Sequence, residues 1–113
     1  MPHVVLEYSQ GVEDLCDMQA LCEDLFQALA TQETFDASAI KVRATPVEFF
    51  RIGTEPQSFV HATLMLMDGR DEPTRRALNA CVLDVLAKSL PGVGSLTVQD
   101  VEMCRATYAK RVL

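Results

Sequence analysis

The order in which strand and helix patterns follow one another is the feature that most limits the fold of this chain. Strands are marked by β-branched residues and a period of two, and helices by apolar residues three and four positions apart. The order is β-α-β followed by β-α-β, and each unit should be a right-handed crossover between parallel strands. We therefore expect a four-stranded sheet of the α/β (α+β) class with two helices on one face. The patterns predict strands at 3–9, 39–45, 59–67 and 95–103, and helices at 13–32 and 72–89.

The repeated order also indicates how the chain is divided. A length of 113 residues fits a single domain, 1–113. Within it, duplicated β-α-β units are expected as pseudo-repeats at about 2–53 and 58–104, separated by a loop that contains Pro56. The sequence similarity of the two halves is weak, so the order of elements is the better sign of duplication.

The third predicted strand suggests an oligomer. Its sequence, FVHATLMLM, is almost continuously apolar, and such strands are usually covered on both faces. Two helices can cover only one face of the sheet, which would leave Val and Leu side chains bare on the other. Because a monomer of this size does not expose a large apolar surface, we expect a homo-oligomer in which these faces meet.

Three local features refine the expected sheet and its end. Pro46 cannot donate to a β ladder, so the second strand should be bent or at an edge there. The apolar parity changes between Val98 and Val101, which indicates a bulge near Gln99 and Asp100. The tail at 104–113 is basic and amphipathic, and it should either dock on a neighbouring surface or fray.

Charge and cysteine content exclude several classes of partner. A net charge of −6 and a pI of about 4.7 argue against nucleic acid or an anionic membrane as the main partner. No stretch approaches the roughly 18 apolar residues of a membrane span, and no secretory signal is recognised, which predicts a cytoplasmic protein with reduced thiols. The four cysteines lack zinc-finger spacing, and His3 and His61 do not complete a ligand set, so no metal is expected.

The first residues suggest a chemistry. Removal of Met1 would leave Pro2 as a free secondary amine at the start of a strand. Such an amine acts as a base at neutral pH once burial and neighbouring cations lower its pKa. The same cations would bind carboxylates and stabilise a negative charge as it forms on a substrate. The candidate cations are Lys41, Arg43 and Arg70.

Each of these residues also has an ordinary structural interpretation. Pro2 can be a common chain start, and Arg70 can be a solvated charge in a turn. Lys41 and Arg43 can line an exposed strand edge, where charged side chains block pairing with other chains. The residues alone leave both interpretations open.

Three stretches resemble a known family. They are MPHVVLEYS at the start, AIKVR in the second strand and FVHATLMLMDGR before the second helix. Their order and spacing are similar to the tautomerase superfamily, and most similar to its 5-carboxymethyl-2-hydroxymuconate Δ-isomerase branch. The resemblance extends over nearly the whole chain. It implies a homotrimer whose sheets face inward, with a cofactor-free active site near each subunit boundary.

The same resemblance implies a reaction and a substrate class. The reaction is a 1,3- or 1,5-proton shift in an unsaturated 2-hydroxy or 2-oxo polycarboxylate. In the branch named above, the substrate is 5-carboxymethyl-2-hydroxymuconate, an intermediate in the aerobic breakdown of homoprotocatechuate. An alternative function is a non-catalytic trimer that kept the fold and acts as a binding or interaction protein.

The family's functional residues map onto this sequence with one departure. The catalytic proline falls on Pro2, and a substrate-binding arginine in a Gly-Arg pair falls on Arg70. A second substrate-binding arginine falls on Lys41, which cannot offer a planar fork to a carboxylate. Either Lys41 acts as a point charge, or Arg43, on the same strand face, takes its place.

Overall fold

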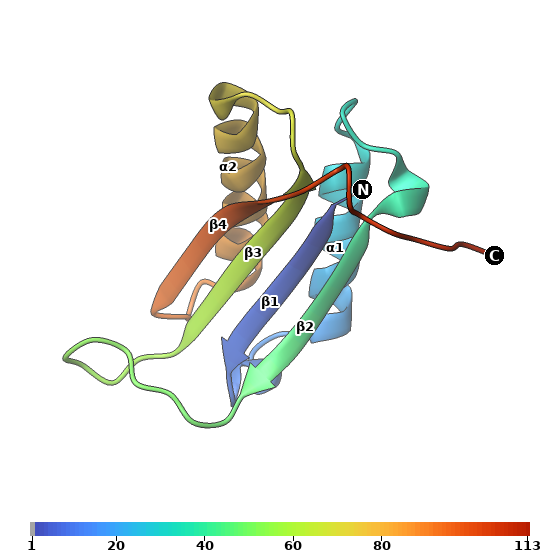
Figure 1. Cartoon of the computed structure of the whole chain (residues 1–113). Helices are drawn as coiled ribbons and strands as arrows, with labels where there is room; N and C mark the ends of the chain where they lie inside the picture. The colour runs from blue at the N-terminus through green and yellow to red at the C-terminus, as the bar shows by residue number, and fades with distance from the viewer. Residues whose placement is uncertain (1) are drawn as a thin grey trace.

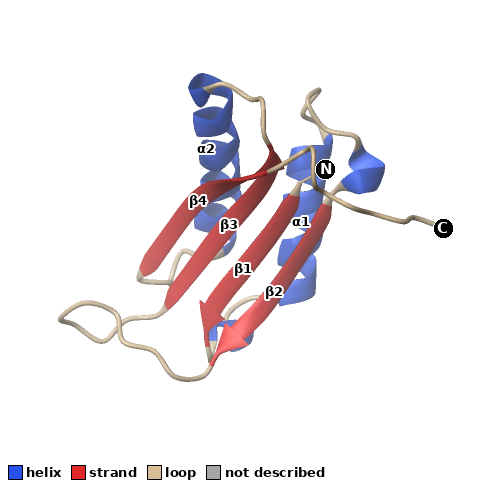
Figure 2. Ribbon diagram, in the orientation of Figure 1, coloured by secondary structure: helices blue, strands red, loops and turns tan. Residues whose placement is uncertain are grey.

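The computed structural model describes residues 2–113 and contains one sheet with two helices packed on one of its faces (Figures 1 and 2). The strand order is β2-β1-β3-β4, with parallel pairing of β1 with β2 and of β3 with β4, and antiparallel pairing of β1 with β3. This arrangement confirms the predicted fold class; the division into pseudo-repeats stays a prediction. The elements are β1 (His3–Ser9), α1 (Met18–Ala30), β2 (Lys41–Val47), β3 (Phe59–Met67), α2 (Glu72–Ser89) and β4 (Ser95–Met103), with 3-10 turns η1 (Val12–Asp14) and η2 (Ala37–Ala39).

The first helix is shorter than its sequence pattern suggested. The predicted helix at 13–32 is wrong at both ends, because α1 begins at Met18 and ends at Ala30. Asp17 caps the helix, since its carboxylate accepts a hydrogen bond from the amide of Ala20 at 3.1 Å. Leu15 was expected in the buried stripe but lies before this cap, and 65% of it is exposed.

The second helix follows its prediction from Glu72 to Ser89. The carboxylate of Asp71 accepts from the amide of Thr74 at 2.9 Å, and Pro73 occupies the first turn, where no backbone donor is needed. The buried stripe of α2 consists of Leu78, Val82 and Leu86.

The open face of the sheet is mixed in character, and the Val and Leu side chains of β3 that were expected on it are not there. Strands turn alternate side chains to opposite faces, so Val60, Leu64 and Leu66 all face the helices and are buried. The other side of β3 carries His61 and Thr63, which belong to a polar network. The imidazole of His61 bonds to the hydroxyl of Thr97 at 2.6 Å and to the amide of Gln99 at 2.9 Å. Apolar residues on this face are Val5, Met65 and Val101, which lie beside the polar network, so the homo-oligomer stays a prediction.

The expected bulge in β4 is also absent from the part of the chain that the structure describes. The register with β3 runs without interruption from Phe59–Ser95 to Met67–Met103. The apolar alternation breaks because Asp100, a charged residue, occupies a helix-facing position. It accepts hydrogen bonds from Arg75 and, at 2.9 Å, from Asn79 on α2. An ion pair between sheet and helix thus replaces an apolar contact.

This ion pair should make stability depend on pH. Burial alone would raise the pKa of Asp100, but hydrogen bonds from Asn79 and Arg75 outweigh it, and the pKa is lowered from 3.8. The stabilising contribution is therefore complete above pH 3.8 and is lost as the pH falls through the lower pKa of the folded state. We expect Asp100→Asn to reduce the free energy of unfolding by about 1–2 kcal/mol at pH 7. Urea denaturation should show this difference shrinking below pH 3.8; a constant difference would contradict the prediction.

The second strand lies at the edge of the sheet, as Pro46 indicated. The predicted range 39–45 is wrong at both ends, because β2 begins at Lys41, continues through this proline, which pairs in register with Tyr8, and ends at Val47. An edge strand tolerates a missing donor, because one side of its backbone has no partner strand within the chain.

Candidate active site

Residue Pro2 lies at the end of the sheet where β1 and β2 begin and β3 and β4 finish (Figure 1). It is buried, and its carbonyl accepts a hydrogen bond from the backbone amide of Lys41 at 3.0 Å. The start of β2 therefore holds Pro2 in place. The expected removal of Met1 concerns a residue outside the described range.

The next residue, His3, joins three segments that are distant in the sequence. A guanidinium nitrogen of Arg43 lies 3.1 Å from Nδ1 of His3, and the hydroxyl of Tyr108 lies 2.8 Å from Nε2. Since arginine can only donate, Nδ1 is the acceptor. In the neutral imidazole the proton is then on Nε2, which donates to Tyr108. The ring of His3 thus connects β2 to the C-terminal tail.

The charges around His3 affect its titration. Burial, and then the positive charges of Arg43 and Lys41, lower the pKa of His3 below 6.5. We expect Arg43→Gln to raise this pKa part of the way back, because one cation is removed while the burial remains. An NMR titration of the His3 ring measures the shift. Arg51→Gln is the matched control, and an unchanged His3 pKa in Arg43→Gln would contradict the prediction.

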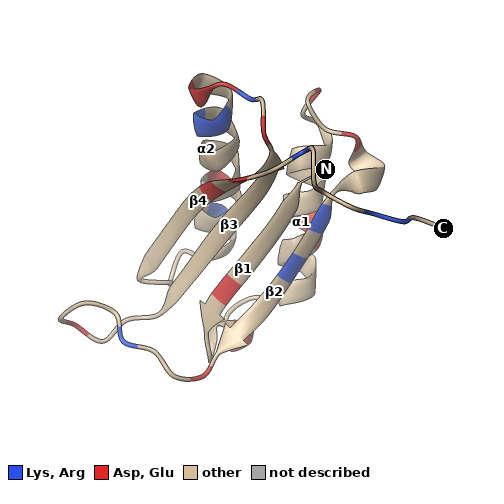
Figure 3. Ribbon diagram, viewed as in Figure 1, with Lys and Arg blue, Asp and Glu red and all other residues tan. Residues whose placement is uncertain are grey.

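The two basic residues of β2 occupy the positions that the alternating pattern predicted. Lys41 pairs with His3 and Arg43 pairs with Val5, and all four side chains belong to the open face. They are the two basic bands on β2 in Figure 3. The ammonium of Lys41 also donates to the carbonyl of Ala39 at 3.2 Å. Both cations lie close to the start of β1, and Arg43 is the one whose guanidinium contacts His3.

The third predicted cation, Arg70, is held at several points. Its Nε donates to the hydroxyl of Thr34 at 3.0 Å, and its two Nη atoms donate to the carbonyls of Met67 and Thr34, each at 3.2 Å. Its guanidinium carbon lies 5.0 Å from the ring centre of Phe35. One N–H on each Nη is left for a ligand. A guanidinium fixed in this way differs from the solvated turn charge that the sequence also allowed.

A cleft next to Arg70 has a volume of about 430 Å³. Burial and the charge of Arg105 lower the pKa of Arg70, so two cations share this cleft. Its wall includes Tyr108, whose hydroxyl bonds to His3 beside Pro2. The cleft is lined by Thr34, Asp36, Met67, Arg70, Arg105, Tyr108 and Lys110.

Three of these lining residues come from the tail and were not predicted as site residues. They are Arg105, Tyr108 and Lys110. The basic, amphipathic character of 104–113 was the available signal, but it could not show which surface the tail contacts. The structure brings the tail to His3 and Arg70, so the four predicted site residues and these three lie at one end of the sheet.

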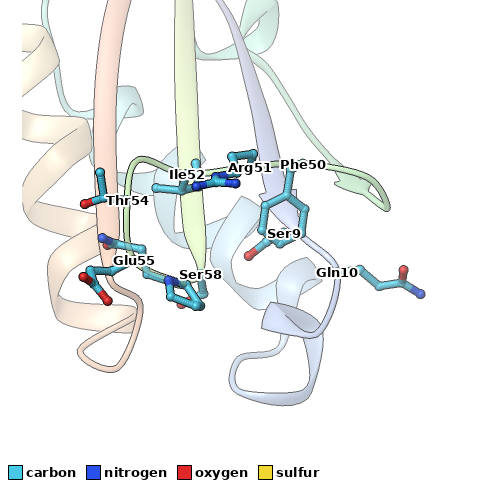
Figure 4. Close-up of a pocket in the computed structure, with 10 residues that line it drawn as sticks. Ser9, Gln10, Phe50, Arg51, Ile52, Thr54, Glu55 and Ser58 are labelled. Atoms are coloured by element: carbon cyan, nitrogen blue, oxygen red, sulfur yellow. The ribbon is translucent and has the colours of Figure 1, made fainter.

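A larger hollow of about 660 Å³ lies at the opposite end of the sheet (Figure 4). Its wall contains Arg51, which donates to the carbonyl of Gly53, and the carboxylate of Glu55. With one charge of each sign, this hollow has no excess of cations for a polyanion. The remaining lining residues are Ser9, Gln10, Phe50, Ile52, Thr54, Pro56, Gln57 and Ser58.

Two further features bear on the class of protein. Among residues 2–113, no group of three or more His, Cys, Asp or Glu side chains is placed to hold a metal ion. No helix in the same range is both long and apolar enough to cross a membrane. The expectation of a site without a cofactor stays a prediction.

Comparison with known proteins identifies a family and several similar structures. The family model described as 5-carboxymethyl-2-hydroxymuconate isomerase matches residues 2–96. A 5-carboxymethyl-2-hydroxymuconate isomerase from Deinococcus radiodurans R1 is 24% identical, with a TM-score of 0.85 over 97% of this chain and 88% of that chain. A 5-carboxymethyl-2-hydroxymuconate delta-isomerase is 22% identical, with a TM-score of 0.87 over 99% and 89%. A fused 4-OT described as a symmetric trimer is 12% identical, with a TM-score of 0.81 over 96% and 93%. No curated protein matches the sequence.

Proposed function

This chain belongs to the 5-carboxymethyl-2-hydroxymuconate isomerase family, and from this premise we propose that it moves a proton within an unsaturated 2-hydroxy or 2-oxo polycarboxylate, with Pro2 as base and acid. Family membership makes the chain an isomerase with a tautomerase-like fold. The proposed substrate is 5-carboxymethyl-2-hydroxymuconate, formed during breakdown of homoprotocatechuate. The proposed location is the cytoplasm.

The proposed reaction needs one proton carrier and an environment for a transient anion. The free amine of Pro2 removes the proton from the 2-hydroxyl group, which leaves a dienolate. The negative charge spreads from that oxygen along the conjugated carbons. Pro2 then returns the proton to a carbon atom, so a 2-oxo product forms and no proton is gained or lost overall.

The surrounding cations have two roles in this proposal. Positive charges close to Pro2 disfavour its ammonium form, so the amine stays a base at neutral pH. They also stabilise the dienolate, because fixed cations in a partly desolvated site interact strongly with a developing charge. Arg43 and Lys41 approach from β2, and Arg70 binds a carboxylate from the cleft.

One observation carries the proposal: the buried Pro2 lies at the sheet end where all three predicted cations are found. Its carbonyl is fixed by Lys41, and its neighbour His3 contacts Arg43 and Tyr108. The alternative, a non-catalytic trimer that binds a partner, predicts a protein in which Met1 is retained on Pro2. Retained methionine would make the proline nitrogen an amide without basicity.

We also propose that the protein is a homotrimer. The fold it shares with the fused 4-OT symmetric trimer supports this. The aromatic residue Phe49 is 85% exposed, and β2 lies at the edge of the sheet. Both provide surfaces for contact between subunits. Sedimentation velocity should give three times the 12.5 kDa mass of the chain; a monomer at micromolar concentration would contradict the proposal.

The function is tested with protein whose N-terminus has been checked by intact-mass measurement. Protein lacking Met1 should convert 5-carboxymethyl-2-hydroxymuconate far faster than buffer does, which is followed by loss of the dienol absorbance. In D₂O, the product should carry one deuterium at carbon, and its position distinguishes a 1,3- from a 1,5-shift. If Met1-free protein gives no acceleration, the proposed function is wrong.

A further inference from the structure

The cleft beside Arg70 collects positive charge in a protein that is acidic overall. The chain has a net charge of −6, yet three cations and a single carboxylate line this cleft. The carboxylate is that of Asp36, whose pKa is lowered by hydrogen bonds from Ser38 and, to a smaller extent, by the charge of Lys110. Lys110 and Asp36 therefore offset each other, and Arg70 and Arg105 remain as an excess of two cations.

The tail that presents Arg105 is held in place. The carbonyl of Cys104 accepts from the amides of Thr107 and Tyr108, at 3.2 and 3.1 Å, which turns the chain back toward the sheet. The hydrogen bond between Tyr108 and His3 fastens this turn near Pro2. Figure 1 shows the tail passing across the ends of the strands beside the N-terminus. The tail is thus a wall of the cleft and does not fray at this point.

The side chain of Arg105 is only loosely paired. Its Nη2 donates to the carbonyl of Asp68 at 3.2 Å, and its Nε lies 3.8 Å from the carboxylate of Asp68. The two side chains are 66% and 49% exposed, so this pair contributes little and leaves donors of the guanidinium unused. A ligand carboxylate can therefore accept two parallel hydrogen bonds from the guanidinium of Arg105 without displacing a strong contact.

We propose that Arg105 binds a third carboxylate of the substrate and thereby makes the cleft selective for tricarboxylates over dicarboxylates. This inference rests on the proposed function, in which Arg70 binds one carboxylate, and on Lys41 or Arg43 binding the second. A cleft of about 430 Å³ is large enough for a small polyacid. Arg105 is a specificity-determining residue that lies away from the reacting carbons, so its loss affects binding more than turnover.

The test compares two substrates that differ by one carboxymethyl group, 5-carboxymethyl-2-hydroxymuconate and 2-hydroxymuconate. Arg105→Gln should raise KM for the tricarboxylate about tenfold and leave kcat within about twofold, because one charge-assisted fork is lost. For the dicarboxylate, kcat and KM of Arg105→Gln should stay within about twofold of the wild-type values. Arg105→Lys should restore part of the affinity for the tricarboxylate. Arg76→Gln, which removes an exposed ion pair with Glu72 on α2, is the matched control and should match the wild type.

A second variant separates direct binding from positioning of the tail. Asp68→Asn weakens the contact that holds Arg105 but keeps its charge. If Arg105 binds the substrate, KM for the tricarboxylate stays the same or falls; a rise as large as that of Arg105→Gln would overturn the proposal. Equal effects of Arg105→Gln on both substrates, or no effect on either, would also overturn it.

Calorimetry distinguishes failure of this inference from failure of the proposed function. Tricarballylate and glutarate are unreactive acids with three and two carboxylates. Wild-type protein should bind tricarballylate about tenfold more tightly than glutarate, and Arg105→Gln should abolish the difference. If this holds while neither hydroxymuconate is isomerised, the proposed function fails and the tricarboxylate site stands. Equal affinities in the wild type would overturn the site.

Discussion

Replacing Pro2 with alanine is expected to lower kcat/KM for the proposed isomerisation by about 10²–10⁴-fold, the range that a positioned general acid-base contributes. Alanine keeps an amine, but it loses the ring that fixes the backbone at this position. The carbonyl of residue 2 still accepts from the Lys41 amide, but without the ring this bond does not hold the amine in one orientation. The measurement is steady-state kinetics on protein whose N-terminal mass is verified.

Two controls accompany this variant. Pro91→Ala makes the same substitution in an exposed turn after α2 and should leave kcat/KM unchanged. Sedimentation should show that Pro2→Ala keeps the wild-type oligomeric state. A Pro2→Ala protein that works at the wild-type rate would show that another group carries the proton.

Blocking the nitrogen tests the same step without changing any side chain. A Gly-Ser extension before Pro2 converts the amine into a tertiary amide, which has neither a proton nor basicity. We expect no activity above buffer while the extension is present, and recovery after a protease restores the free proline. Full activity of the extended protein would contradict the role of Pro2.

Replacing Arg70 with alanine is expected to lower kcat/KM by about 10–10²-fold, because the substrate carboxylate loses a charged hydrogen-bond donor that contributes about 1.5–3 kcal/mol. It should also lower the free energy of unfolding by about 1–3 kcal/mol. The carbonyls of Met67 and Thr34 lose their donor, and the ring of Phe35 loses its cation. Kinetics and urea denaturation of the same sample give the two effects.

A lysine at this position separates binding from stability. Arg70→Lys keeps the charge near Phe35 but cannot serve Thr34, Met67 and a substrate carboxylate together, because an ammonium lacks the planar fork. We therefore expect most of the stability to return while kcat/KM stays at least about tenfold below wild type. If Arg70→Lys were as active as the wild type, the charge alone would be sufficient.

Local patterns predicted most of the secondary structure. Strands β3 and β4 and helix α2 have the predicted bounds, because alternation and helical spacing are read from adjacent residues, and Asp71 caps α2. Helix α1 was predicted too long. The acidic residues that precede α1 also have helical spacing. Only the hydrogen bond that the Asp17 carboxylate accepts from the amide of Ala20 shows where the helix starts.

Contacts across the sheet could not be predicted in the same way. The parity change in β4 was attributed to a bulge, but its cause is the pairing of Asp100 with Arg75, 25 positions away. The open face was expected to be apolar because the third strand is apolar overall. The structure puts Val60, Leu64 and Leu66 on the helix side together and leaves His61, Thr63 and Met65 on the other.

Within the candidate site, the face shared by Lys41 and Arg43 followed from the period of two in β2. The anchoring of Arg70 by Thr34 did not follow from any pattern, because the two residues are 36 positions apart. The tail residues Arg105 and Tyr108 were not predicted to line the site; the bond between Tyr108 and His3 joins residues 105 positions apart.

The class of fold, the order of its elements and the candidate residues follow from local sequence patterns, because these depend on periodicity, capping and short motifs within a few positions. Which of these residues share one end of the sheet became known from the folded structure alone. Strand pairing brings β1, β2 and β3 together there, and the tail then covers the same end. Such contacts depend on packing between distant segments, and no local pattern of apolar and polar residues encodes them.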